Sequence, residues 1–511
     1  MLFNSYVFVL LFLPLSVLGF LGFARWGHRH LAIGWLVLAS LFFYGWWNPP
    51  YLGLILGSIL FNYTVGLVLA RPGLPRKALL VLGVAVNLSL LGYFKYANFF
   101  VNNLNAAAGT HLHLAPIVLP LAISFFTFQQ ITYLVDSFRG ETHEYNFLHY
   151  CLFVTFFPQL IAGPIVHHRE MLPQFKRDEI YRFHHDSLAV GLTIFIFGLF
   201  RKVVLADTLA LYATPVFTLA REGGVPTFFE AWGGVLAYTF QLYFDFSGYS
   251  DMAIGLGAML GIRLPMNFNS PYKATSIIDF WRRWHMTLSR FLHEYVYIPL
   301  GGNRRGRPRR YVNLMVTMLL GGLWHGAGWT FVLWGALHGV YLVINHAWRA
   351  LRRGRQGGGL GARVTSRGLT FLAAVLGWVF FRAESFPAAM RMLKSMAGEA
   401  GISLPYALRE HLGSIPGLGF GGMFYHRLAN WDAGIFWLLA AGAIVWFTPN
   451  TQRLMHRFNP AFETYRGGEH DAQARWLHWR PSVGWALLTA VLAVWSLIKM
   501  SSVSEFLYYQ F

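Results

Sequence analysis

The sequence is poor in charged residues and has almost no cysteine. Charged residues make up 12% of its 511 positions, and Cys151 is the single cysteine. Soluble proteins average about 25% charged residues, so this composition excludes an ordinary water-soluble domain. One cysteine excludes an internal disulfide and a cysteine-ligated metal cluster. Because Cys151 lies in an apolar run, we expect a buried, inert thiol.

Acidic residues are also scarce. The chain has 22 Asp and Glu against 41 Lys and Arg, which gives a formal net charge of +19. A basic chain can indicate a nucleic-acid ligand, but in membrane proteins Lys and Arg collect in cytoplasmic loops and produce the same excess. We therefore predict no nucleic-acid partner and expect membrane lipids to surround the chain.

Apolar runs occupy most of the chain, since 55% of the residues are hydrophobic and 17% are aromatic. A helix of about 20 apolar residues crosses ~30 Å of hydrocarbon, and about 11–13 such runs occur. Period-2 alternation is absent, which favours helices over a barrel. The sequence predicts an all-α polytopic membrane protein, organised as one domain over 1–511. Its expected parts are N-terminal spans at 1–205, a catalytic core at 206–348 and C-terminal spans at 349–511.

Loop charges predict an orientation. Met1–Phe23 is expected to be a retained first span rather than a signal peptide, because no basic region or small-residue cleavage pattern precedes Arg25. The basic clusters Arg25–Arg29 and Arg71–Lys77 are expected inside, which places the N-terminus outside. Residues 98–113 are expected to form an outer loop, followed by a fifth span at 116–135.

The run 147–166 is interrupted twice, by Pro158 and by Gly163-Pro164. Broken helix at membrane depth is tolerated where it is buried or lines a wet cavity. The pattern therefore favours a re-entrant or cavity-lining element.

A helical hairpin is expected between two basic segments, Arg304–Arg310 and Arg349–Arg355. If both are cytoplasmic, the residues between them cross the membrane an even number of times, with a turn near Gly326–Gly328. At 1.5 Å per residue, His325 then lies about 21 Å from the start of the first span. His338 is also expected at membrane depth.

Histidine provides the candidate chemistry, because an imidazole exchanges protons near neutral pH, as acyl transfer to a hydroxyl requires. His285 and His325 occur in tight aromatic and glycine surroundings. The alternative is that each only hydrogen-bonds neighbouring helices, and Asp251 could likewise belong to a structural polar network. We predict no metal site, since histidine pairs four residues apart are missing among the candidates. Hydrolase, phosphate-loop and dinucleotide motifs are absent too.

Several long motifs, in order along the chain, resemble the membrane-bound O-acyltransferase family, in the branch of the alginate O-acetyltransferase membrane subunit. The motifs lie at 1–8, 156–164, 241–251, 265–271, 279–285, 324–326 and 506–511. The resemblance implies a helical bundle with interrupted segments and a central funnel. It places His325 on the family's active-site histidine and His285 on its second polar position, where other branches have Asn or Asp.

The resemblance also implies how an acetyl group would move. Acetyl-CoA, or another acyl thioester, would enter as a substrate from the cytoplasm near Arg304–Arg310, with no tightly bound cofactor. His325 would act as general base or transiently accept the acetyl group, His285 and Trp284 would position it, and Arg282 or Arg283 would offset negative charge. Lipid-headgroup binding is the alternative for these arginines. The candidates for donor or substrate binding are Trp284, Arg282, Arg283, Asp279, Trp324, Asn267, Gln159, Arg304 and Arg305.

The expected setting is the bacterial inner membrane, with periplasmic acetyltransferase partner proteins that complete transfer to an exported polysaccharide. Alginate is the first expectation, and cellulose or peptidoglycan is the alternative. Two other classes remain open at this point. Polar residues at membrane depth also occur in transporters, and a non-catalytic scaffold of a secretion complex would make His325 dispensable.

Overall fold

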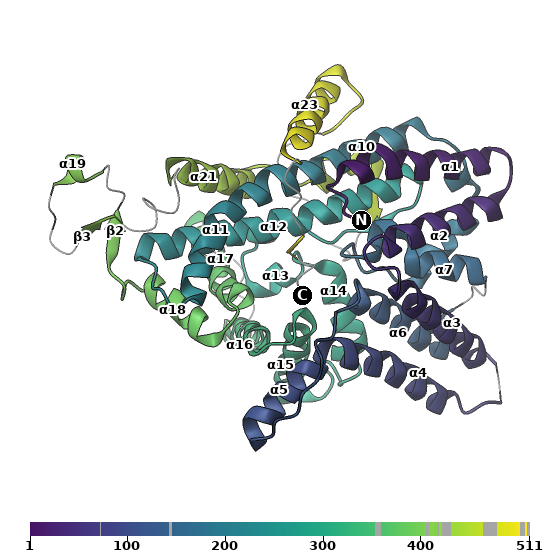
Figure 1. Cartoon of the computed structure of the whole chain (residues 1–511), viewed down its shortest axis with the longest axis horizontal. Coiled ribbons are helices and arrows are strands. Elements are labelled where there is room, and N and C mark those ends of the chain that lie inside the picture. Colours follow the sequence, from purple (N-terminus) through teal and green to yellow (C-terminus); the bar gives the residue numbers. More distant parts are fainter. Residues whose placement is uncertain are drawn as a thin grey trace. The chain divides into compact units, whose positions relative to one another are not determined.

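The computed structural model shows a helical protein (Figure 1). The described residues are 1–71, 73–142, 146–352, 359–404, 408–413, 415, 418–421, 431–462, 478–500 and 506–507. They form two compact units. The first comprises Met1–Phe200, Tyr249–Asn267 and Thr451–Gln510, and the second comprises Arg201–Gly248 and Phe268–Asn450.

Five helices in the described part of the chain are long and apolar enough to cross a membrane. They are Phe8–Arg25, Tyr51–Leu69, Arg76–Ala108, His185–Arg221 and Leu360–Arg382. Many large apolar side chains on them point outward, among them Leu18, Leu60 and Leu369. Outward apolar faces on long helices are stable in lipid, where the helix satisfies its own backbone hydrogen bonds. The prediction of an all-α polytopic membrane protein is confirmed, while the expected number of spans and the central funnel stay predictions.

The first unit contains most of the N-terminal helices. Their bounds are α1 Leu13–Arg25, α2 Arg29–Gly45, α3 Tyr51–Leu69, α4 Arg76–Leu91, α5 Ala97–Ala108, α6 Ile123–Arg139, α7 Phe147–Thr155, α8 Phe157–Leu160, α9 His168–Met171 and α10 His185–Phe200. The unit also holds the end of α12 (Phe228–Met259), α22 (Thr451–Leu454) and α23 (Val483–Lys499). Strands β1 (Leu264–Pro265) and β4 (Ala461–Phe462) pair in parallel.

Two predictions about the first unit are wrong. Most of the expected outer loop at 98–113 is helical, because α5 occupies Ala97–Ala108. The fifth span does not begin at 116, since the chain has no regular structure from 109 to 120 and α6 begins at Ile123. Pro116 and Pro120 explain the delay, because proline cannot donate to a helix interior.

The predicted interruption within 147–166 is confirmed. Helix α7 ends at Thr155, and the short α8 follows after an extended Phe156. Side chains satisfy the broken backbone: Gln159 Nε2 donates to the Phe153 carbonyl at 2.7 Å, and the Phe157 amide donates to Ser40 Oγ at 3.1 Å. Buried polar groups at a helix break need such partners.

The second unit contains the predicted hairpin. Its helices are α11 Asp207–Arg221, the first part of α12, α13 Ile277–Trp281, α14 Met286–Leu292, α15 Gly306–His325, α16 Trp329–Leu351, α17 Leu360–Arg382, α18 Phe386–Met396, α19 Arg409–Leu412 and α21 Trp431–Phe447. Strands β2 (Ile402–Leu404) and β3 (Leu418–Phe420) pair in parallel. Residues 353–355 of the expected basic segment Arg349–Arg355, and residues 508–511 of the motif at 506–511, lie outside the described residues.

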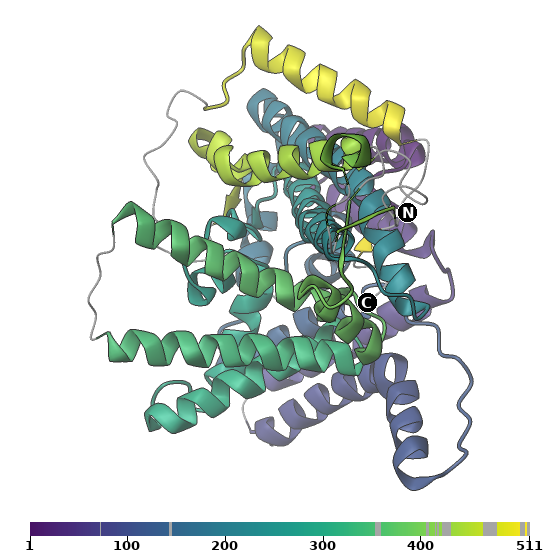
Figure 2. The same ribbon diagram turned by 90° about the vertical axis from the view of Figure 1, so that its left-hand side faces the viewer.

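Glycines hold α15 and α16 together. A Cβ added at Gly335 would lie 2.4 Å from the Met318 carbonyl oxygen, and one added at Gly322 would lie 2.3 Å from the Phe331 carbonyl oxygen. Small residues allow membrane helices to approach closely. Figure 2 shows this hairpin with α17 running beside it. The predicted turn between 326 and 328 is confirmed.

A buried lysine forms ion pairs in the second unit. Lys202 Nζ lies 2.8 Å from Asp207 Oδ1 and 2.9 Å from Asp245 Oδ1, and its side chain is 2% exposed. Because a buried charge needs compensation, this network ties α12 to the start of α11.

Candidate active site

His325 is the last residue of α15 and is buried, with 3% of its surface exposed. The helix ends there because the next residue, Gly326, is extended, with φ −170° and ψ 151°. A Cβ at Gly326 would lie 2.2 Å from the Phe331 ring, so the turn is too tight for a side chain. The glycine turn therefore places the imidazole at the turn end of the hairpin.

His285 lies in an unusual backbone conformation. It precedes the first residue of α14, with φ 42° and ψ 54°, and it is fully buried. A left-handed conformation is unfavourable for a residue with a Cβ, and it persists where surrounding packing enforces it. Helix α13 ends at Trp281, and the turn through Arg282–Trp284 brings the His285 ring inward.

The two histidines share one aromatic enclosure. Their ring centroids are 6.4 Å apart. His325 contacts Trp324, Trp334 and Phe381 at centroid distances of 4.9, 5.1 and 5.0 Å. Rings that surround an imidazole exclude water and leave proton exchange to the bound reactants.

The His285 side of the enclosure is built from other elements. Phe246 of α12 lies edge-on to the His285 ring at 4.7 Å, and Trp324 lies at 5.9 Å. Trp284 packs behind it, 4.8 Å from Trp378 of α17. Four helices and one strained turn therefore fix the orientation of the pair.

A third histidine lies deeper in the hairpin. His338 of α16 is fully buried, and its ring contacts Trp281 at 5.3 Å, Trp334 at 4.9 Å and Tyr341 at 5.6 Å. The Trp334 ring contacts both His338 and His325.

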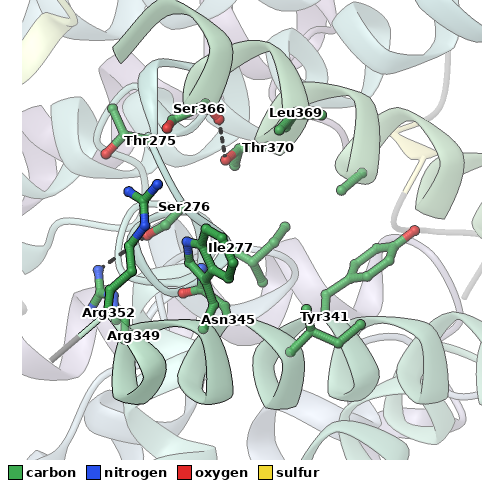
Figure 3. A pocket seen from close by; sticks show the side chains of 13 residues that line it. Thr275, Ser276, Ile277, Tyr341, Asn345, Arg349, Arg352, Ser366, Leu369 and Thr370 are labelled. Carbon is green, nitrogen blue, oxygen red and sulfur yellow. Dashed lines mark hydrogen bonds between the residues drawn. The ribbon is translucent and has the colours of Figure 1, made fainter. Parts of the chain in front are cut away.

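A cavity of about 590 Å³ opens between α16, α17 and the segment before α13 (Figure 3). Arg349 and Arg352 lie at one end of it and Tyr341 at the other. Arg349 Nη2 donates to Ser276 Oγ at 3.4 Å. The rest of the wall has both polar and apolar side chains. They belong to Thr275, Ile277, Ile344, Asn345, Trp348, Ser366, Leu369, Thr370 and Ala373. The cavity therefore has a cationic end and a mixed polar and apolar lining toward Tyr341.

The other predicted residues lie in several places. Trp324 and Trp284 lie in the aromatic enclosure. Arg283 Nε is 2.8 Å from Asp279 Oδ1, so these two candidates pair with each other, while Arg282 is exposed. Arg304 and Arg305 are exposed where α15 begins.

Gln159 and Asn267 belong to the first unit. Asn267 Nδ2 donates to Ser250 Oγ at 3.1 Å, and both side chains are buried. Their hydrogen bonds have local structural roles, and a part in substrate binding stays a prediction. Among the described residues, no three His, Cys, Asp or Glu side chains gather as metal ligands would.

Sequence reasoning did not identify the aromatic residues that enclose the histidines, chiefly Phe246, Trp334, Trp378 and Phe381. One signal was present in the sequence. Trp334 and His338 are four residues apart, and Trp378 and Phe381 are three apart, which places each pair on one helix face. The sequence does not tell which helix faces meet, because that depends on packing between helices rather than on spacing within one helix.

Comparison with known proteins adds to this geometry. The model of the membrane-bound O-acyltransferase (MBOAT) family matches residues 85–364. The chain is 47% identical to the peptidoglycan O-acetyltransferase of Helicobacter pylori, over 80% of this chain and 82% of that protein. It is 40% identical to the "Probable alginate O-acetylase AlgI" of Pseudomonas aeruginosa, over 100% of both chains. It is 30% identical to the teichoic acid D-alanyltransferase of Streptococcus thermophilus, over 45% of this chain and 57% of that protein.

Proposed function

The chain belongs to the membrane-bound O-acyltransferase family, and from this premise we propose that it passes acetyl groups from a cytoplasmic thioester across the inner membrane for O-acetylation of an exported polysaccharide. Family membership makes it an O-acyltransferase and a multi-pass inner-membrane protein. An acyltransferase is neither a transporter nor a non-catalytic scaffold, so those two alternatives are excluded. The observation that supports the chemical proposal is the buried pair His285 and His325, with ring centroids 6.4 Å apart.

The chemistry proposed for His325 is general base catalysis. Its imidazole takes the proton of an acceptor hydroxyl as the hydroxyl oxygen attacks the acetyl carbonyl. The C–S bond then breaks, and the departing thiolate takes the proton from the imidazolium. The acetyl group is now an ester, and His325 is neutral again. His285 and Trp284 hold the reacting group in position.

Acetyl-CoA is the proposed donor, and the cavity between α16 and α17 is its proposed binding site. The positive-inside rule assigns the end with Arg349 and Arg352 to the cytoplasm. Guanidinium groups are suited to bind the phosphates of a nucleotide. The thioester would reach His325 past Tyr341 and Trp334, while the acceptor hydroxyl would approach from the outer side.

Alginate is the proposed polymer and peptidoglycan the alternative. A relative that matches the whole chain, at 40% identity, is named for alginate. The relative named for peptidoglycan has a higher identity, 47%, but matches 80% of this chain. Periplasmic acetyltransferase partners are proposed to complete the transfer to the polymer.

The test uses cells that lack their own copy and express either the parent or His325→Ala at equal membrane levels. Acetate esters are measured separately on exported alginate and on purified peptidoglycan. The parent should restore esters on alginate, and loss of the general base should lower them by about 10²- to 10⁴-fold.

The matched control is His28→Ala, which removes an exposed histidine of a loop and should leave ester content unchanged. Full ester content with His325→Ala would refute the catalytic assignment. Restoration on peptidoglycan alone would replace the proposed polymer with the alternative.

A further inference from the structure

Polar atoms without hydrogen-bond partners gather around His338. Neither Nδ1 nor Nε2 of its ring has a partner among the described residues, and the same holds for the indole nitrogens of Trp281 and Trp334. Both indole rings contact the His338 ring, at 5.3 and 4.9 Å. Three neighbouring side chains therefore have buried polar atoms with unused hydrogen-bonding capacity.

Such a cluster is unfavourable in a folded protein without a ligand. Buried polar groups are almost always hydrogen-bonded, and each exception requires an explanation. Helix packing does not explain this cluster, because apolar side chains of similar shape would fill the space without the desolvation cost. A bound polar group would satisfy these atoms.

The cluster lies between the cavity and His325. Tyr341 lines the cavity and contacts the His338 ring at 5.6 Å, and Trp334 contacts both imidazoles. Asn345, on the cavity wall, has a buried Oδ1 that also lacks a hydrogen-bond partner. The unused polar atoms therefore follow the route from the cavity to His325.

Glycine leaves one side of the His338 ring without a side chain above it. A Cβ at Gly377 of α17 would lie 2.7 Å from His338 Nε2. A larger residue there would press against that nitrogen, so the glycine allows the His338 ring to pack closely against α17.

The chemistry of the cluster fits a secondary amide. Two indole N–H groups offer donors, the Asn345 oxygen offers an acceptor, and a neutral imidazole offers one of each. A secondary amide has one carbonyl acceptor and one N–H donor. A hydrocarbon chain would leave all of these groups unsatisfied, which argues against a lipid tail.

We propose that His338, Trp281 and Trp334 bind an amide of the donor's pantetheine arm and thereby hold the thioester beside His325. The proposal rests on the proposed function, because it assumes a donor such as acetyl-CoA. Arg349 and His338 are about 16 Å apart along α16 at 1.5 Å per residue. A long, slender arm connects phosphates at the arginines to an amide at His338.

The test measures binding rather than transfer, so it needs no acceptor. Purified full-length protein is titrated with S-ethyl-CoA, a thioether that cannot transfer its ethyl group, and with adenosine 3′-phosphate 5′-diphosphate, which lacks the arm. Loss of one or two hydrogen bonds should weaken S-ethyl-CoA binding by about 3- to 10-fold in His338→Phe. Binding of the arm-free nucleotide should change by less than about twofold.

Two further variants separate recognition from folding damage. Trp281→Phe keeps an aromatic ring, although a smaller one, and removes the N–H, so it should show the same selective loss. His338→Gln restores a donor and an acceptor and should recover part of the affinity. Arg349→Gln is the matched control at the cationic end, and it should weaken both ligands alike.

Equal weakening of both ligands by His338→Phe, or no weakening, would overturn the proposal. If the parent bound neither ligand yet still acetylated polysaccharide in cells, acetyl-CoA would not be the donor. The proposed amide site would then be refuted as well. If the parent bound S-ethyl-CoA but His325→Ala cells kept full acetylation, the proposed catalysis would fail and the binding result would stand.

Discussion

At the scale of single residues, substitutions at His285 can distinguish the contribution of its backbone conformation from that of its imidazole. Its φ of 42° suits Asn much better than Ala, because Asn readily adopts left-handed conformations. We expect His285→Asn to keep most of the stability and part of the acetyl transfer. His285→Ala should be about 1 kcal/mol less stable than His285→Asn and should lose more of the activity.

The measurement for His285 is thermal unfolding of purified protein, paired with acetate ester content in cells. The prediction concerns the ranking of the two variants. Equal stability and equal activity of His285→Asn and His285→Ala would show that neither the left-handed backbone nor a polar side chain matters there.

Both histidines of the pair stand out in the sequence as candidates, because Trp284 precedes His285, and Trp324 and Gly326 flank His325. The conformation of His285 could not, since φ at one residue depends on packing by Phe246 and Trp324. The surroundings of His338 could not be predicted either. Its cage combines Trp281, Trp334 and Trp378, which come from three helices.

At the scale of elements, the contact between α15 and α16 should tolerate no added methyl group. Gly335→Ala would place a Cβ 2.4 Å from the backbone oxygen of Met318, which cannot rotate away. Overpacking of this kind costs about 1–3 kcal/mol. We expect a lower unfolding temperature and reduced acetylation, because the helix that ends at His325 must shift.

Gly368→Ala is the control for this contact. Gly368 lies within α17, and a Cβ there would meet nothing within 4 Å. Replacing a helical glycine at an open position should leave stability unchanged or raise it by about 0.5–1 kcal/mol. Similar effects of both substitutions would contradict close packing at Gly335.

The ion pairs of Lys202 give a second prediction for elements. Lys202→Met leaves the buried Asp245 carboxylate without its cation and should destabilise the protein by about 3–5 kcal/mol. The double variant Lys202→Met/Asp245→Asn removes the uncompensated charge, so it should recover part of that loss. Unfolding by heat in detergent measures the difference, and no recovery would mean that charge compensation is not the cause.

Long apolar helices were predictable because hydropathy depends on local composition alone. Shorter elements were not. Helix α5 was predicted as a loop because its Asn-rich sequence looks polar, yet its residues 97–108 continue the helical course of α4. The turn between α13 and α14 is likewise set by tertiary packing around Trp284.

At the scale of the whole molecule, we predict the orientation in the membrane from the charge of the loops. Labelling of single added cysteines can test it, because the chain has one natural cysteine. Cys151 is buried, so an added cysteine should react alone with an impermeant maleimide. His111→Cys should be labelled in intact cells whose outer membrane is permeable, and Arg307→Cys only after the inner membrane is opened. Labelling of Arg307→Cys in intact cells would reverse the predicted orientation.

Each compact unit is assembled from segments far apart in the sequence, such as Met1–Phe200 with Thr451–Gln510. Hydropathy predicts which segments lie in the membrane but does not specify their partners. Pairing depends on side-chain shape, as at Gly191, where a Cβ would lie 2.7 Å from the Gly255 carbonyl oxygen. The class of fold was therefore predictable, and the assembly of the units was not.

The glycine contact between α15 and α16 also constrains how the protein is made. Neither helix is among those of the described chain that are apolar enough to cross a membrane alone. Helix α15 begins with Arg307, Arg309 and Arg310, and entry of such a segment into lipid by itself is unfavourable. The two helices should therefore leave the translocon as a pair. If synthesis stops within the Gly326–Gly328 turn, the released chain has α15 without α16, and we expect quality-control proteases to recognise it.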